Sequence, residues 1–268
     1  MLGGGGPLGV GWQAGLVTAL AESGVRLADA DYVVGTSAGS IVGAQLMLGR
    51  PLADLIGPVG GTAPWRGDSD PDDLGELLAS RSPEDATPEG EWVAHFDFLG
   101  GAGWPARFHC TSFSLDSGRF AVWDASSGVP LPRAVASSCT VPGLVSPVTI
   151  GGSTWIDGGA RDALNADLAI GHETVVALSC MSLDPPAGAM PDLLAGLLPG
   201  TRGRIDELRA SGSAVEVIEP GAEFAELSGW GHHLMDVQRT RAAFDAGRRQ
   251  GDAERGRIQA LWADAART

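Results

Sequence analysis

Short apolar runs alternate with helix-like segments along most of the chain. Residue types favoured in strands fill residues 32–34, 107–115, 120–123, 174–178 and 214–218. Apolar residues recur at helical spacing in 12–22, 40–48, 130–138, 163–170 and 191–210, and through 234–266. The run from 174 to 178 is almost continuously apolar, which is typical of a strand buried on both faces. The pattern therefore predicts strands and helices along the same chain, with residues 174–178 in a parallel part of the sheet.

Two turns in the middle of the chain predict hairpins. Asp116-Ser117-Gly118 separates the strand-like runs 107–115 and 120–123. Gly151-Gly152 divides the run 149–156 in the same way. A loop at 139–143 and a stop at Gly171 complete the expected boundaries. We expect antiparallel strands in this part of the sheet.

Residues 51–105 differ in composition from the rest of the chain. They are rich in Pro, Gly and Asp and include an acidic run at 68–73, which we interpret as a solvated loop in which Asp72 caps a short helix, not as a cation site. A second short helix is expected at 91–96. Five aromatic residues could line an apolar entrance or pack as a satellite core: Trp65, Trp92, Phe96, Phe98 and Trp104. We interpret this segment as a substrate-facing insertion within one domain, residues 1–268.

Composition narrows the class of partner. The chain has 268 residues, 44% of them hydrophobic, and a formal charge of −15. Such acidity argues against nucleic acid and against electrostatic docking on anionic lipid, so we expect at most transient contact with a membrane surface. Cys110, Cys139 and Cys180 lack metal-ligand spacing and suggest buried thiols in a reducing compartment. Without a visible signal peptide or membrane span, we expect a cytoplasmic protein with no metal and no cofactor.

The sequence Gly35-Thr36-Ser37-Ala38-Gly39 matches the pattern Gly-x-Ser-x-Gly. It lies between the strand-like run 32–34 and the helical segment 40–48, which is the strand–turn–helix context in which a nucleophilic serine is presented. Gly35 and Gly39 permit the close approach of strand and helix. The Ser37 hydroxyl is then expected at a helix N-terminus, where free N–H groups favour developing negative charge.

A glycine-rich stretch, residues 3–11, opens the chain and leads into a helix. Such a loop can direct several backbone N–H groups at one anion. Only Met1 and Leu2 precede it, so the buried strand that such a loop normally follows is almost missing. Either that strand is truncated or the recorded start is late.

Two interpretations of the loop compete. Gly4, Gly6 and Gly9 fit a dinucleotide-binding fingerprint, with Asp29 or Asp31 as the ribose-binding acid. Alternatively, the loop is an oxyanion hole for Ser37, because loops at the carboxyl ends of neighbouring parallel strands share one crevice. The second interpretation explains both motifs with one site and is preferred.

A third motif supplies a base. Asp157 ends a predicted strand and is followed by Gly158 and Gly159, which let other backbone approach. Asp-Gly alone is a common turn dipeptide. The order of a glycine-rich loop, a Gly-x-Ser-x-Gly turn and then Asp-Gly-Gly is much more specific than any one of these parts.

With these three motifs the chain resembles the patatin-like phospholipase family over nearly its whole length. The resemblance implies an α/β fold, a three-layer α/β/α sandwich around a mostly parallel sheet. It also implies Ser37 as nucleophile, Asp157 as base, and an oxyanion hole from the loop Gly4-Gly5-Gly6-Pro7-Leu8-Gly9. Leu8 departs from the pattern, since many members carry a cation there. We expect Gly4, Gly5 and Gly6, with Ala38, to supply the oxyanion donors.

The implied activity is that of a serine lipid acyl hydrolase acting on a lipid or ester through an acyl-enzyme. A Ser-His-Asp triad using His232 or His233 is less favoured, because 36 residues before Ser37 leave no room for the upstream strands of an α/β-hydrolase. His95, His109 and His172 have no distinctive neighbours. The alternatives are a dinucleotide-binding oxidoreductase and a non-catalytic lipid-binding member of the same fold.

Overall fold

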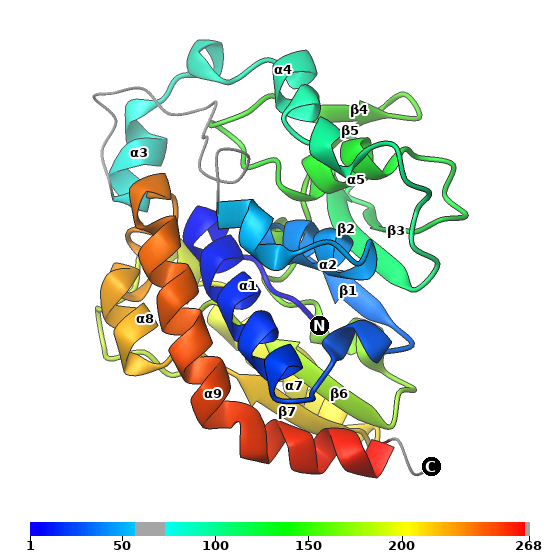
Figure 1. Ribbon diagram of the computed structural model, residues 1–268. Coiled ribbons are helices and arrows are strands. Elements are labelled where there is room, and N and C mark those ends of the chain that lie inside the picture. The colour runs from blue at the N-terminus through cyan, green and yellow to red at the C-terminus, as the bar shows by residue number, and fades with distance from the viewer. Residues whose placement is uncertain (57–72, 266–268) are drawn as a thin grey trace.

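The computed structural model describes residues 1–56 and 73–265, and it has the predicted α/β class (Figure 1). Strands occupy 14% of the chain and helices 49%, because the strands are short. The strands are β1 (Val33–Gly35), β2 (Phe108–Ser114), β3 (Phe120–Trp123), β4 (Val148–Ile150), β5 (Ser153–Asp157), β6 (Thr174–Leu178) and β7 (Ala214–Ile218). The helices are α1 (Gly6–Glu22), α2 (Ala38–Met47), α3 (Leu74–Ser80), α4 (Glu89–Ala94), α5 (Leu131–Ser138), α6 (Asp192–Ala195), α7 (Leu198–Ala210), α8 (Ala222–Leu227) and α9 (Thr240–Ala265).

The sheet is mixed. β1 pairs in parallel with β2, and β6 pairs in parallel with β7. Leu2 joins these two halves through parallel bridges to Gly35 and Leu178. β2 pairs antiparallel with β3 and β5, and β5 with β4, as the two turns predicted. The parallel strands therefore form one side of the sheet, with the two hairpins added at the other.

Helices cover both faces of this sheet. The larger core cluster packs α1, α2, α5 and α9 against one face, and a second cluster packs α7 and the turn at 166–169 against the other. α1 and α9 lie side by side (Figure 1) in backbone contact. A Cβ added to Gly15 would lie 2.0 Å from the Phe244 carbonyl oxygen, and one on Gly247 would lie 2.1 Å from that of Trp12. Glycine is thus required where these helices cross.

Several predicted boundaries are wrong. The helix expected at 163–170 is a loop followed by a 3-10 turn, Ala166–Ala169. The carboxylate of Asp162 accepts the N–H groups of Leu164 and Asn165, and Asn165 adopts a left-handed conformation with φ of 51°. These side-chain bonds compete with a helix for the same donors.

The helix expected at 191–210 is divided into α6 and α7, because Pro199 lacks an N–H that could donate to a carbonyl of the preceding turn. The first helix begins at Gly6, six residues earlier than predicted.

The segment 51–105 contains α3 and α4 in its described part. Asp73, not Asp72, caps α3 by accepting the N–H of Glu76 at 2.9 Å. Asp72 and Trp65 lie outside the described residues, as does the rest of the acidic run. Trp92 and Phe96 are buried in the larger core cluster. Among the described residues, no helix has the length and apolar character that crossing a bilayer requires.

Candidate active site

Ser37 occupies a strained turn between β1 and α2. Its φ of 52° and ψ of −120° lie in a region that side chains other than glycine rarely adopt. The flanking glycines are required, since a Cβ on Gly35 would lie 2.4 Å from the Gly39 carbonyl oxygen. A Cβ on Gly39 would lie 2.1 Å from the Leu2 carbonyl oxygen. The close packing that the motif predicted is therefore present.

Three hydrogen bonds hold this turn in place. The Ser37 N–H donates to the Ser138 hydroxyl at 3.1 Å. The Ser37 carbonyl accepts the Ser40 hydroxyl at 2.6 Å and the Cys139 thiol at 3.2 Å. Ser138 and Cys139 lie about a hundred residues further along the chain, so the sequence motif gave no sign of these contacts. They stabilise a backbone conformation that is costly by itself.

The glycine-rich loop lies directly beside Ser37. A Cβ on Gly4 would lie 3.3 Å from the Cβ of Ser37. The Gly3 carbonyl accepts the N–H of Gly39 at 3.1 Å, which ties the loop to the start of α2. The Gly4 N–H donates to the Ala163 carbonyl at 2.7 Å, so Gly4 fixes the loop but has no free donor for a substrate.

Other amides at the site remain available. In the described part of the chain, no hydrogen bond occupies the N–H groups of Gly5, Gly6 and Ala38. Gly6 and Ala38 are the first residues of α1 and α2, and both line one small cavity with Ser37. Because the N-terminus of a helix carries partial positive charge, two such termini favour negative charge at this point.

Asp157 lies at the end of β5 in contact with Ser37. Its carboxylate is hydrogen-bonded to the Ser37 side chain and accepts the Gly159 N–H at 2.7 Å. Burial raises the pKa of Asp157 to about 7, although both hydrogen bonds act to lower it. A Cβ on Gly158 would lie 2.1 Å from the Thr111 hydroxyl oxygen, so glycine is required after the acid. The fold thus brings the predicted nucleophile and base together.

A buried polar network connects the two motifs. The Thr36 hydroxyl lies 2.9 Å from that of Thr111 and accepts the side-chain amide of Asn165 at 3.0 Å. The same amide donates to the Asp162 carbonyl at 2.7 Å. The Asp162 carboxylate accepts the Thr201 hydroxyl at 2.7 Å. The network joins the residue before Ser37 to the loop after Asp157, and its members were not recognised from the sequence.

The cavity beside Ser37 has a volume of about 90 Å³ and mostly apolar walls. Its remaining lining residues are Pro7, Val10, Ile41, Leu55, Trp92, His95, Phe96, Phe98, Cys139, Val141 and Met235. Within this described lining there is no arginine, aspartate or glutamate. Leu8, which occupies the position of the family's cation, is fully buried in the core and does not line the cavity.

The histidines are distributed over different environments. His95 lines the cavity and stacks on Trp92, with an interplanar angle of 7°, and burial lowers its pKa. His232 forms an ion pair with Asp73 at the start of α3. His172 stacks on Tyr32, and His109 contacts the same ring at an interplanar angle of 48°. His95 is therefore the histidine to compare with Asp157, although the sequence gave it no prominence.

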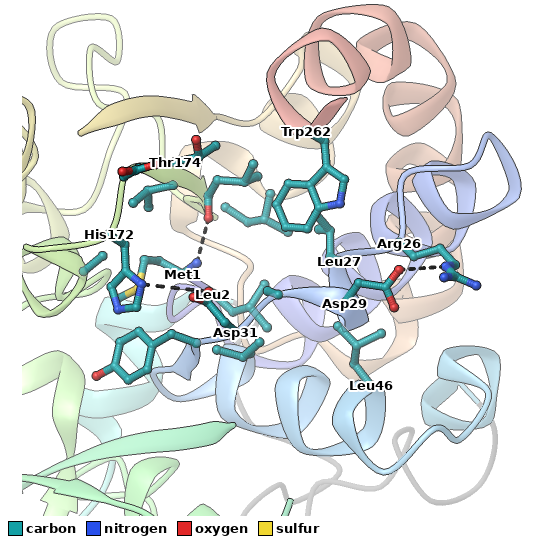
Figure 2. Close-up of a pocket in the computed structure, with 18 of the residues that line it drawn as sticks. Met1, Leu2, Arg26, Leu27, Asp29, Asp31, Leu46, His172, Thr174 and Trp262 are labelled. Atoms are coloured by element: carbon teal, nitrogen blue, oxygen red, sulfur yellow. Dashed lines mark hydrogen bonds and ion pairs between the residues drawn. The ribbon is translucent and has the colours of Figure 1, made fainter. Parts of the chain in front are cut away.

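The residues that a dinucleotide-binding site would need do not line one pocket. Asp29 and Asp31 line a separate pocket of about 890 Å³, and Gly4, Gly6 and Gly9 do not line it (Figure 2). Gly6 instead faces the cavity of Ser37. The described residues also contain no group of three His, Cys, Asp or Glu side chains that could hold a metal ion.

We therefore expect no saturable binding of NAD or NADP, because the loop and the acid that would share the cofactor face different cavities. Isothermal titration calorimetry of the protein with each nucleotide measures this directly. Binding with a micromolar dissociation constant would restore the dinucleotide interpretation.

A family model described as patatin-like phospholipase matches residues 1–170, which include the glycine-rich loop, Ser37 and Asp157. A search of curated proteins gives no match.

Proposed function

The chain belongs to the patatin-like phospholipase family, whose members act on lipids, and we propose that it hydrolyses lipid esters with Ser37 as nucleophile and Asp157 as base. One observation carries the proposal. A serine in a strained turn is hydrogen-bonded to a buried carboxylate whose pKa burial raises to about 7. An aspartate at its ordinary value near 4 would be a poor base, whereas a pKa near the working pH suits proton transfer.

The proposed reaction begins with attack of the Ser37 hydroxyl oxygen on the ester carbonyl carbon. Asp157 accepts the hydroxyl proton as the new C–O bond forms. The tetrahedral intermediate then collapses, the leaving alcohol takes the proton, and the acyl group remains on Ser37. Water attacks the acyl-enzyme with Asp157 again as base, which releases the acid and regenerates the hydroxyl.

The negative charge of the intermediate needs donors that are not already engaged. The amides of Gly5, Gly6 and Ala38 meet this requirement at two helix N-termini. Removal of one such donor typically costs about 2.7–4 kcal/mol of transition-state stabilisation. We assign Gly4 the separate role of anchoring the loop through its bond to Ala163.

The lining of the cavity suggests the type of substrate. Its uncharged, largely apolar walls favour an acyl chain and offer no cation for a phosphate. An apolar cavity of about 150 Å³ holds one benzene molecule. A cavity of about 90 Å³ therefore suits a neutral ester with a short acyl group.

Labelling with a fluorophosphonate probe tests the proposed function. The probe's phosphorus should bond to the Ser37 oxygen, because the site provides both an activated hydroxyl and an oxyanion hole. Peptide mass mapping should locate the adduct on Ser37, and pretreatment with a short-chain ester substrate should slow labelling. A protein that is not labelled but still binds fatty acid would favour the non-catalytic alternative. An adduct on another serine would show that Ser37 is not the nucleophile.

A further inference from the structure

The peptide unit that joins Gly4 to Gly5 lies beside Ser37 and is not itself fixed by a hydrogen bond. A Cβ on Gly4 would lie 3.3 Å from the Cβ of Ser37. In the described part of the chain, the Gly4 carbonyl accepts no hydrogen bond and the Gly5 N–H donates none. With glycine on both sides, this peptide unit can reverse its orientation at little steric cost. Its orientation therefore depends on the two neighbouring peptide units.

Both neighbouring peptide units are held by hydrogen bonds. In the unit that follows, the Gly5 carbonyl accepts the Gly9 N–H at 2.8 Å, at the start of α1. The unit that precedes joins Gly3 to Gly4, and its N–H donates to the Ala163 carbonyl at 2.7 Å. Its carbonyl oxygen, on Gly3, is the second point at which this unit is held.

Gln13 of α1 supplies a side-chain donor to the Gly3 carbonyl. Its Nε2 donates to this oxygen at 2.9 Å, and the Gly39 N–H donates to the same oxygen at 3.1 Å. Gln13 is fully buried and lies one helical turn after Gly9, on the same face of α1. The side-chain amide therefore reaches the loop from within the core.

The Gln13 amide also contacts Cys180, which packs against the loop. Its Nε2 lies 3.0 Å from the Cys180 sulfur. A Cβ on Gly5 would lie 2.4 Å from the Cβ of Cys180, and one on Gly9 would lie 2.9 Å from its sulfur. Burial raises the pKa of Cys180 to about 12, so the thiol stays neutral and places no negative charge against the loop. Gln13 and Cys180 thus form an uncharged support for the glycines.

The orientation of the Gln13 side chain has a cost in stability. While its Nε2 faces the Gly3 carbonyl, its Oε1 is buried and has no hydrogen-bond partner among the described residues. A buried acceptor without a partner destabilises a folded protein. An apolar side chain of similar size would fill the space without this cost. Stability of the fold therefore does not favour glutamine at this position.

We propose that Gln13 is a positioning residue of the oxyanion hole, which holds the Gly3 carbonyl so that the Gly5 N–H faces the reacting ester carbonyl. The inference rests on the proposed function, because it concerns the same reaction. Without the Gln13 amide, the Gly3 carbonyl keeps the Gly39 N–H and a thiol contact of 3.9 Å. The next peptide unit then turns its N–H away in part of the molecules. This loss weakens binding of the transition state and leaves binding of the acyl chain unchanged.

The test is Gln13→Met, with Gln45→Met as the matched control. Gln45 of α2 is also a buried glutamine whose Oε1 has no partner among the described residues, but its Nε2 donates to the Pro51 carbonyl at 3.1 Å. Removal of a whole oxyanion donor costs about 10²–10³-fold in kcat. For Gln13→Met, kcat for a short p-nitrophenyl ester should fall by about 10- to 100-fold, with KM within about twofold. Gln45→Met should keep both constants.

Two further measurements separate a positioning role from a structural one. The melting temperature of Gln13→Met should fall by no more than about 2 °C, because the unsatisfied Oε1 is removed and the Gly3 carbonyl keeps a donor. Hydrogen exchange of the Gly4 N–H, followed by NMR, should be at least about fivefold faster than in Gln45→Met. This amide reports how firmly the peptide unit before the oxyanion donor is held, and it does so without turnover.

The outcomes distinguish this inference from the proposed function. If the unsubstituted chain hydrolyses the ester and folded Gln13→Met keeps its kcat, the positioning role is wrong and the proposed function stands. A Gln13→Met protein that does not fold, or that melts much earlier with normal kcat, would make Gln13 a structural residue. An unsubstituted chain with neither turnover nor fluorophosphonate labelling would overturn the proposed function, and this inference with it.

Discussion

Replacement of Ser37 by alanine should reduce the hydrolysis of a short p-nitrophenyl ester by about 10⁴-fold or more, because the bond-forming oxygen is removed. The fold should persist, since the hydrogen bonds that hold the turn use the backbone of Ser37 and not its hydroxyl. The measurement is steady-state turnover at pH 8 with purified protein, alongside circular dichroism and a melting curve.

Ser126→Ala is the matched control, because Ser126 is exposed in the loop after β3 and does not line the cavity. It should keep full activity. A folded Ser37→Ala protein with near-normal turnover would contradict the acyl-enzyme mechanism, whatever its lipid-binding properties.

The sequence predicted the parts of the site that depend on local backbone. The turn at Ser37 could be recognised because Gly35 and Gly39 are needed on either side of it for steric reasons. Asp157 could be recognised because it ends a hairpin strand and precedes two glycines. The strands carried residue types favoured in strands, and their predicted positions agree with the structure within one or two residues.

The sequence failed where long-range side-chain contacts decide the structure. The segment 163–170 has helical apolar spacing, but the buried carboxylate of Asp162 accepts the N–H groups of Leu164 and Asn165 at its start. The Gly4 N–H donates to the carbonyl of Ala163, which lies 159 residues further along the chain. His95 enters the cavity through its stacking on Trp92 in α4, which no motif indicates.

Burial of Asp157 also lowers the stability of the folded protein near neutral pH. The pKa of about 7 in the folded protein exceeds the ordinary value of 3.8, so the folded state holds a proton more tightly than the unfolded state. Stability from this group is complete below about pH 4 and is lost as the pH rises towards 7. The difference corresponds to about 4 kcal/mol at pH 8, where the buried carboxylate is ionised. The site thus trades stability for a base that works near neutral pH.

Asp157→Asn should therefore have two opposite effects. Turnover should fall by about 10²–10⁴-fold, because the amide cannot accept the Ser37 proton. The melting temperature at pH 8 should rise, since the buried charge is gone and the amide oxygen can still accept the Gly159 N–H. Asp206→Asn, on the exposed face of α7, is the matched control and should change neither quantity.

The pH profile and the histidine variants separate a dyad from a triad. If Asp157 is the base, kcat/KM should rise with pH through about 7 and level off above it. Replacement of His95, His232 or His233 by alanine should preserve this rise of kcat/KM with pH and most of the turnover. Circular dichroism checks that each variant is folded. Burial lowers the pKa of His95 below its ordinary 6.5. If His95 were the base, kcat/KM would therefore rise at a lower pH. A folded histidine variant as inactive as Asp157→Asn would indicate a Ser-His-Asp triad instead of a Ser-Asp dyad. If the residual kcat/KM of Asp157→Asn still rose with pH near 7, Asp157 would not be the base.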